Sequence, residues 1–512
     1  MSSDFAANVP APPAAPRTFC PPEGRRFVLI AAILASSMGF IDGSVVSLAM
    51  PAIRADLGAS LVDAQWISNA YLLFLSALVL IGGAAGDVFG VRNIFAAGIA
   101  LFMVTSLACA VAPDASTLII MRGLQGIGAA LMVPGSLAII AKAYPAETRG
   151  HAIGLWASFS SLTTAFGPVI GGMVLSFGDA WMWRLIFAIN VPIGLVALAM
   201  IYLRVPQDRA GDRRRLDVPG ALLATLGLGL LAWGLTEFGL APADRIGSPW
   251  AMIAAGCVAM ILFVAWEMRA RAPMVKLELF RSAAFSGANV YTLVLFFALS
   301  AVLFFLPMTV VSAWGAPEWQ ASLLLLPLSA AIALLSGFAG RFADRVGPRL
   351  PLTIGALFMT VSYAAVGFTM PLMQMWTVTL PLLGLQALGM AMLVSPLSAA
   401  VMLATPDADT GLASGVNNAV ARAAGLIAVA ALGAVAAIVF AATAGDAGTG
   451  LEFGARPDTA PDPAAETLRV AASNQAFAVI AWVSAALCLV AALVAWLTQP
   501  SWRPGEKPAH IR

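Results

Sequence analysis

Long apolar runs recur along the whole chain, and they limit the folds that it can adopt more than any other feature. A helix of roughly 20 apolar residues crosses the hydrocarbon core of a bilayer, and it satisfies its own backbone hydrogen bonds there. We count fourteen such runs, near residues 27–50, 64–85, 93–112, 117–141, 150–175, 184–203, 217–237, 250–268, 285–310, 320–340, 350–370, 374–397, 414–442 and 474–498. The sequence therefore predicts an all-α integral membrane protein with fourteen transmembrane helices.

Composition excludes several classes of function. Only 11% of the residues are charged, whereas soluble domains carry about 25%. The net charge of +2 gives no indication of nucleic-acid binding. The phosphate-binding element GxxxxGK[ST] does not occur in the sequence, so nothing indicates ATP-driven transport. His151, His510 and the four scattered cysteines form no metal-ligating cluster. We therefore expect no cofactor, no metal and no nucleic-acid partner, and we find no catalytic cluster that would indicate an enzyme.

Lysine and arginine concentrate in alternate loops, as the positive-inside rule describes. If the N-terminus is cytoplasmic, 21 of the 28 basic residues fall in cytoplasmic segments, five in outer segments and two within spans. This bias predicts a multi-pass protein of the cell (inner, or cytoplasmic) membrane with both termini in the cytoplasm. The first apolar run exceeds the core of a signal peptide, so we expect it to be retained as a span.

A repeated Gly-x-x-x-Asp-x-x-Gly string divides the chain into two related halves. It lies in the loop after the second span and again in the loop after the tenth, within residues 82–93 and 337–349. Two inserted spans then separate two six-helix halves, and we expect this pair to be a lipid-facing appendage. The predicted segments are a disordered cytoplasmic tail (1–25), a six-helix bundle (26–203), a linker with two inserted helices (204–283), a second six-helix bundle (284–498) and a cytoplasmic tail (499–512).

Asp42 places a carboxylate inside the first apolar run. A charge near the middle of a spanning helix costs roughly 2.5 to 3.5 kcal/mol, so such an acid is a functional candidate by default. Arg122 is the candidate partner, because both residues should lie in the outer half of the same helical bundle. The alternative is that Arg122, which is only about five residues into its span, extends to the outer interface.

The loop repeat resembles a motif of the major facilitator superfamily, in particular of its fourteen-span drug:proton antiporters (EmrB/QacA type), and the resemblance covers residues from about 26 to 497. The motif reads roughly Gly-x-Leu-Ala-Asp-Arg-x-Gly-Arg-Lys. It matches Gly83, Asp87, Gly90 and Arg92 in the first copy and Gly340, Asp344, Arg345, Gly347 and Arg349 in the second. Val88 and Val91 replace expected bases in the first copy. The resemblance implies a cytoplasmic gate latch, and the alternative is a tight turn.

The fourth and fifth spans contain two further strings of this kind. RGLQGIGAA, which begins at Arg122, is similar to the family's motif B, whose arginine is linked to proton transfer. The fifth span is similar to the antiporter signature, motif C, at Gly154, Gly167, Pro168, Gly171 and Gly172. Proline removes a helix hydrogen bond and glycine permits close approach, so we expect a kinked helix packed tightly against a neighbour. Thr163 replaces one glycine of the family pattern.

The thirteenth span contains the family-like string GLASGVNNAVARAAG. Its polar residues, Asn417, Asn418 and Arg422, either pack helices at the cytoplasmic end or face a central cavity. Gln125, in the fourth span, is also a candidate for lining that cavity.

The resemblance implies a secondary transporter in which two bundles open a central cavity alternately to each side, driven by the proton gradient. We expect Asp42 to bind the proton beside Arg122. The small-molecule substrate should be an amphipathic drug or toxic compound, cationic or neutral, because ionised Asp42 would attract a cation. Alternatives are a dedicated exporter of one endogenous metabolite or antibiotic, a proton symporter for uptake, and a non-transporting receptor or scaffold. The sequence does not determine whether a periplasmic adaptor protein is a partner.

Overall fold

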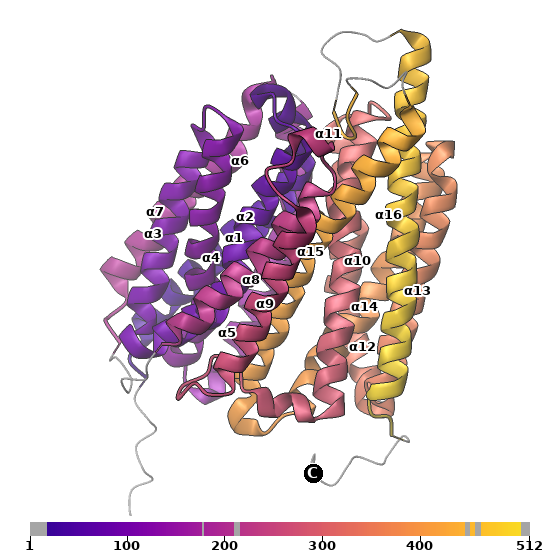
Figure 1. The fold of residues 1–512 in the computed structure, drawn as a ribbon. Helices are drawn as coiled ribbons and strands as arrows, with labels where there is room; N and C mark the ends of the chain where they lie inside the picture. The colour runs from indigo at the N-terminus through magenta and orange to yellow at the C-terminus, as the bar shows by residue number, and fades with distance from the viewer. Residues whose placement is uncertain (1–17, 177–178, 209–215, 446–450, 456–461, 503–512) are drawn as a thin grey trace, which may run out of the picture.

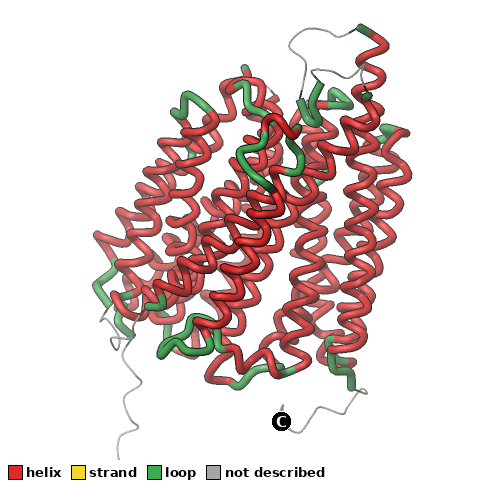
Figure 2. Tube along the Cα trace, viewed as in Figure 1, coloured by secondary structure: helices red, strands yellow, loops and turns green. Residues whose placement is uncertain are grey.

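The computed structural model describes residues 18–176, 179–208, 216–445, 451–455 and 462–502. These residues form helices joined by short loops, and no strand occurs among them (Figure 2). Fourteen helices are long and apolar enough to cross a membrane. The predicted all-α fold of fourteen spans is therefore confirmed, whereas most of the two predicted tails lies outside the described residues.

Six spans form the first half of the chain. They are built from α1 (Pro22–Leu57), α2 (Leu61–Phe89), α3 (Val91–Ala110), α4 (Ala115–Ala143), α5 (Ala146–Ser176), and a sixth span of η1 (Ala180–Trp183), α6 (Arg184–Ala188) and α7 (Asn190–Arg204). The sixth span is interrupted between α6 and α7, just before Pro192. Proline has no backbone N–H to donate, which accounts for the interruption.

The remaining spans comprise the inserted pair and the second half. The inserted pair is α8 (Val218–Glu237) and α9 (Pro249–Glu267). The second half contains α10 (Ala283–Ser312), α11 (Glu318–Leu323), α12 (Leu326–Val346), α13 (Arg349–Thr369), α14 (Leu380–Leu403), α15 (Thr410–Ala444) and α16 (Pro463–Thr498). α11 and α12 together form one span.

Several helices extend beyond the apolar runs that predicted them. α1 covers Pro22–Leu57 instead of 27–50, and α16 begins at Pro463 instead of 474. The predicted boundary at residue 26 is therefore too late for the first bundle. Hydropathy detects only the part of a helix that lies in hydrocarbon. The backbone hydrogen bonds continue into the polar region until a residue such as Gly58, at φ 60°, ends the helix.

The even number of spans brings the start of α1 and the end of α16 to the same end of the assembly. We call this the tail end, which is the lower end in Figure 1. The opposite end, where α1 and α15 finish, is called the far end. The two six-helix halves stand side by side, and α8 and α9 lie in front of the boundary between them (Figure 1).

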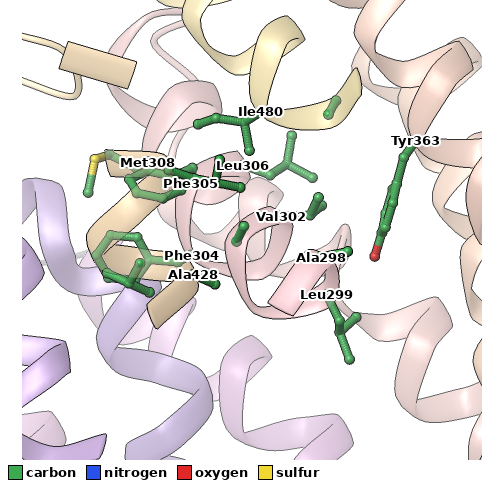
Figure 3. Close-up of a cluster of buried hydrophobic side chains, with 14 of the residues drawn as sticks. Ala298, Leu299, Val302, Phe304, Phe305, Leu306, Met308, Tyr363, Ala428 and Ile480 are labelled. Carbon is green, nitrogen blue, oxygen red and sulfur yellow. The ribbon is translucent and has the colours of Figure 1, made fainter. Parts of the chain in front are cut away.

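The core of the second half is centred on α10. Its buried residues include Val302, Phe305 and Leu306, and Tyr363 from α13 and Ile480 from α16 belong to the same buried cluster (Figure 3). Helices in lipid gain little from the hydrophobic effect between them, so close van der Waals packing of this kind supplies the association. α15 and α16 thus pack directly on α10, whereas α13 packs on α16 and α14 and is joined to α10 by the hydrogen bond from Tyr291 to the backbone oxygen of Leu352.

The inserted pair is more than a lipid-facing appendage, which corrects the expectation from the sequence. The Trp233 ring of α8 meets Trp66 of α2 edge to face, with centroids 6.1 Å apart. A Cβ on Gly239, just after α8, would lie 3.2 Å from Cα of Ala434 on α15. α8 therefore packs against both halves, across the line where α2 meets α15.

α9 packs against α8 through glycines. A Cβ on Gly227 of α8 would lie 2.6 Å from Sδ of Met260, and one on Gly256 of α9 would lie 2.8 Å from Cγ of Leu231. Such small residues allow two helix backbones to approach closely in lipid. α9 is therefore held to the two halves mainly through its neighbour.

Candidate functional site

Asp42 and Arg122 form an ion pair in the interior of the first half. Asp42 on α1 is 0% exposed and Arg122 on α4 is 2% exposed. Nη1 of Arg122 donates to Oδ1 of Asp42 at 2.8 Å and to Oδ2 at 2.6 Å. The structure thus brings together the two residues that the sequence proposed as partners, and Arg122 turns inward instead of toward the interface.

Gln125 completes a polar network around this pair. Its Nε2 donates to Oδ1 of Asp42 at 3.1 Å and to Oγ of Ser106 at 2.7 Å, and its Oε1 accepts from Nη1 of Arg122 at 2.6 Å. Nδ2 of Asn190, at the start of α7, donates to the same Ser106 oxygen at 3.2 Å. The acid is therefore tied through hydrogen bonds to α3, α4 and α7.

Tyr71 on α2 is a site residue that the sequence reasoning missed. The guanidinium carbon of Arg122 lies 4.3 Å from the centroid of its ring, a cation–π distance. Nε of Arg122 also donates to the backbone oxygen of Ile67 at 3.1 Å. A tyrosine within an apolar run gives no signal of this contact, because the contact depends on how α2 is rotated about its own axis.

The glycines of the fifth span pack against the part of α1 that carries Asp42. A Cβ on Gly167 would lie 3.4 Å from Cγ1 of Ile41, and one on Gly171 would overlap Cγ1 of Val45. Pro168 lies between these glycines inside α5. Thr163, the departure from the family pattern, instead shares a hydrogen bond of 3.0 Å with Ser37 of α1.

The other two glycines of this signature differ from each other in their surroundings. A Cβ on Gly172 would lie 2.8 Å from the backbone oxygen of Glu318 on α11, in the second half. A Cβ on Gly154, nearer the tail end, would meet no atom within 4 Å. The far-end portion of α5 thus joins α1 to the second half, whereas nearer the tail end α5 still contacts α1 through Trp156 and Ser36 and is open only on the face that carries Gly154.

The first copy of the loop motif fastens the α2–α3 turn to the end of α7. Gly90 adopts φ 92°, which favours glycine, and Gly83 faces Pro134 of α4. Nε of Arg92 donates to the backbone oxygen of Val205 at 2.8 Å. Asp87 is 73% exposed, and among the described residues its carboxylate pairs only with Lys142, at 3.6 Å. The contacts of this copy stay within the first half.

Asp208 caps this turn, and the sequence reasoning did not identify it. Its carboxylate accepts from the backbone N–H of Val91 at 2.9 Å and from that of Arg92 at 3.1 Å. These two groups begin α3 and have no partner within the helix. Asp208 thereby supplies the helix cap that the motif itself does not.

The second copy repeats the arrangement in the second half. Gly347 adopts φ 85°, and Nε of Arg349 donates to the backbone oxygen of Gln499, just after α16, at 2.7 Å. Gly340 packs against Ser395 of α14, and the backbone oxygen of Asp344 accepts from Trp502 at 3.1 Å. Arg345 forms no side-chain hydrogen bond or ion pair with any described residue. In both halves, the arginine after the turn thus binds a carbonyl at the end of the last helix.

The polar residues of α15 separate into two groups. Nδ2 of Asn417 donates to Thr292 of α10 at 2.7 Å and to Asn289 at 3.3 Å, so Asn417 joins two helices of the second half. Asn418 is exposed. Arg422 is half-buried, and its Nε has no hydrogen-bond partner among the described residues.

The two halves are linked at the far end by Arg54 of α1. Its guanidinium donates to Glu452 at 2.6 Å and to the backbone oxygen of Phe453 at 2.7 Å. At the far end of α5, Oγ of Ser176 donates to Glu318 of α11 at 3.2 Å. Among the described residues, no group of three or more His, Cys, Asp or Glu side chains could hold a metal ion.

Comparison with known proteins identifies the family. The sequence profile of the Major Facilitator Superfamily matches residues 32–429 and 292–510. The chain belongs to the Major Facilitator Superfamily. It is therefore a multi-pass membrane transporter and not an enzyme.

Its relatives in this superfamily include exporters of drugs and antibiotics. The chain is 31% identical to the multidrug resistance protein Stp of Mycobacterium tuberculosis, over 81% of this chain and 76% of that protein. It is also 31% identical to the tetracenomycin C resistance and export protein of Streptomyces glaucescens, over 80% and 75%. A methylenomycin A resistance protein of Bacillus subtilis is 35% identical, over 62% and 67%.

Solved structures confirm the fold. A bacterial homologue of the lysosomal transporter Spinster superimposes with a TM-score of 0.63 at 15% identity, over 93% of this chain and 96% of that one. The xylose transporter XylE of E. coli gives a TM-score of 0.59 at 17% identity, over 93% and 99%. The two related six-helix halves are thus those of the superfamily.

Proposed function

We propose that the protein is a proton-coupled antiporter that exports amphipathic drugs or toxic compounds through a site that opens alternately to each side of the membrane. The observation that carries this proposal is the buried pair of Asp42 and Arg122, with both carboxylate oxygens engaged. A buried ion pair is not required for stability, because well-packed apolar residues of similar volume are often as stabilising. Proton uptake and release by Asp42 would account for the pair.

Protonation of Asp42 would change how α1 is held. Both carboxylate oxygens of Asp42 accept hydrogen bonds from the guanidinium of Arg122 in the buried interior. A neutral Asp42 would no longer attract Arg122, so the contact between α1 and α4 would weaken. Because Gly167 and Gly171 of α5 pack beside Asp42, a shift of α1 would be transmitted to α5. The protonation state would thereby bias the balance between two arrangements of the helices.

The tail end is proposed to face the cytoplasm, in line with the distribution of basic residues. In this orientation, the contact between Arg54 and Glu452 closes the outer side, and the open surroundings of Gly154 lie toward the cytoplasm. The glycine motifs that begin at Gly83 and Gly340 would then act as latches when the tail end closes. The sequence favoured a cationic or neutral substrate, and the charge of the substrate is taken up again below.

A dedicated exporter of one endogenous metabolite or antibiotic is the second candidate. The specific observation in its favour is that two relatives are named for resistance to single antibiotics, tetracenomycin C and methylenomycin A. The multidrug resistance relative favours a broader range of substrates. The fold is the same in both cases, so only the range of substrates separates them.

The test uses the purified full-length protein in liposomes that contain a pH-sensitive dye, with an imposed pH gradient. A panel of amphipathic cations, neutral compounds and acids is added, and substrate-evoked proton movement is recorded. We expect Asp42→Asn to abolish this movement. Asp56→Asn is the matched control, because Asp56 is an acid on the same helix that binds Trp183 and Arg184 at the far end.

Each of the other possible results would favour a different function or a different coupling residue. Unchanged proton movement in Asp42→Asn would exclude Asp42 as the coupling group. A response to a single compound would favour the dedicated exporter. Proton and substrate movement in the same direction would indicate a symporter, and no response to any compound would favour a receptor or scaffold.

A further inference from the structure

Arg422 places a positive charge within the membrane-spanning part of α15. It lies twelve residues after Thr410, where α15 begins, which corresponds to a depth of about 18 Å along the helix axis. Its Nε is buried without a hydrogen-bond partner, and no described carboxylate forms an ion pair with it. Arg122, in contrast, is paired with Asp42. The centre of the protein therefore contains one uncompensated guanidinium.

α15, which carries Arg422, packs on α2, which carries Tyr71 of the Asp42 network. Nε2 of Gln65 on α2 donates to the backbone oxygen of Val429 at 3.0 Å, and a Cβ on Gly425 would lie 3.7 Å from Cδ1 of Leu72. Arg422 precedes Gly425 by less than one turn, so it belongs to the part of α15 that packs on α2. α2 also carries Tyr71, whose ring contacts Arg122, so the helix on which this part of α15 packs takes part in the Asp42 network.

The same face of α15 carries a second polar group that is free to bind. Asn418 lies four residues before Arg422, so the two side chains are neighbours on the helix surface. Asn418 is exposed, whereas Asn417 is occupied with Thr292 and Asn289 of α10. An amide and a guanidinium are thus available side by side, and both donate hydrogen bonds.

The charges available at this place favour an anion. Both oxygens of Asp42 are engaged by Arg122 and Gln125, so little of its charge remains for a cationic substrate. An unpaired guanidinium in the membrane is costly, and carboxylate or phenolate oxygens are the groups that it binds best. One substrate anion would cancel the one uncompensated charge, so the loaded site would be neutral.

We propose that Arg422, with Asn418 beside it, binds an anionic oxygen of the substrate, and that the exported compounds are amphipathic acids carrying a carboxylate or an ionised phenol. The inference rests on the proposed export function, because it assigns the substrate class of that transporter. It replaces the expectation of a cationic substrate, which assumed that Asp42 is free to attract one.

The test compares two dyes with the same xanthene ring system, the anion fluorescein and the cation rhodamine 123. Equilibrium binding to the purified full-length protein in detergent is measured by fluorescence anisotropy, without any pH gradient. We expect fluorescein to bind at least about tenfold more tightly. Arg422→Gln should weaken fluorescein binding about tenfold or more, as expected for loss of a charge-assisted hydrogen bond, without weakening rhodamine 123 binding. Arg422→Lys, which keeps the charge, should lose less.

Arg269→Gln is the matched control, because Arg269 is an exposed arginine just after α9, and it should bind both dyes as the native protein does. Rhodamine 123 binding as tight as that of fluorescein, or fluorescein binding unaffected by Arg422→Gln, would overturn the proposal. If Arg422→Gln does not fold, the proposal is tested by the preference of the native protein for fluorescein over rhodamine 123 and by the affinity of Arg422→Lys for fluorescein. Fluorescein binding that depends on Arg422, without any proton-coupled movement in liposomes, would refute the antiporter and leave this site standing.

Discussion

Gly167 of α5 lies against Ile41, the residue before Asp42 on α1. A Cβ at this glycine would be 3.4 Å from Cγ1 of Ile41 and 3.7 Å from its Cα. One turn further on, Gly171 meets Val45. α5, which carries the antiporter-like glycines, therefore contacts the helical turn of α1 that contains Asp42. This contact connects two sequence features that lie far apart in the chain.

Gly171→Val should disturb transport by steric overlap. A Cβ at this position overlaps Cγ1 of Val45, and overpacking of this kind costs typically about 1 to 3 kcal/mol. We expect a lower melting temperature and reduced transport. The double variant Gly171→Ala with Val45→Ala should recover both, because it removes the overlapping methyl groups. Gly154→Val is the control, since no atom lies within 4 Å there, and a loss as large as that of Gly171→Val would contradict this explanation.

Arg122→Gln should destabilise the protein more than the paired change does. Removal of one partner leaves a buried charge unpaired, which costs about 3 to 5 kcal/mol. In the double variant Asp42→Asn with Arg122→Gln, no charge is left. A double-mutant cycle of unfolding free energies should therefore give a combined cost smaller than the sum of the two single costs. Additive costs would show that the two residues do not interact.

Asp208→Ala should lower stability, although Asp208 lies outside the recognised motif. Its carboxylate accepts from the backbone N–H groups of Val91 and Arg92, and loss of a helix N-cap costs about 0.5 to 2 kcal/mol. Asp87→Ala should change the unfolding free energy by less than about 0.5 kcal/mol, because Asp87 is 73% exposed. Unfolding followed by circular dichroism measures both. The reverse order of the two effects would refute the capping role.

Arg54→Met should weaken the far-end link more than Glu452→Gln. The Arg54 side chain is 4% exposed and also donates to the backbone oxygens of Ala59 and Phe453. Its loss leaves these carbonyls unpaired, at about 1 to 3 kcal/mol each. Glu452 is 52% exposed, so its pairing contributes at most about 1 kcal/mol. Melting temperatures of the two variants test this order, and equal effects would mean that the carbonyl contacts contribute nothing.

The number of spans and the partnership of Asp42 with Arg122 could be predicted from the sequence, because both depend on distance along helices of known rise. Hydropathy gives the spans, and topology gives the depth of each residue. The remaining members of the site depend on how each helix is rotated about its own axis. Tyr71, Ser106 and Asn190 lie in apolar runs whose pattern does not distinguish a facing helix from lipid, so they were not predicted.

The capping role of Asp208 was not predicted for a different reason. It lies in a loop without periodicity, and its contact with the start of α3 depends on the path of the chain after α7. The packing of α8 was missed in the same way, since an apolar helix that touches two bundles has the same composition as one surrounded by lipid.

The position of α8 makes the two flanks of the transporter unequal. On one flank, α8 covers the far-end part of the line between α2 and α15 with Trp233 and Gly239. On the other flank, α5 packs against α12, and neither α8 nor α9 packs on either of them among the described elements. We expect a compound dissolved in the bilayer to enter sideways only past α5 and α12. The inserted pair would then leave the transporter with a single lateral entry route from the bilayer.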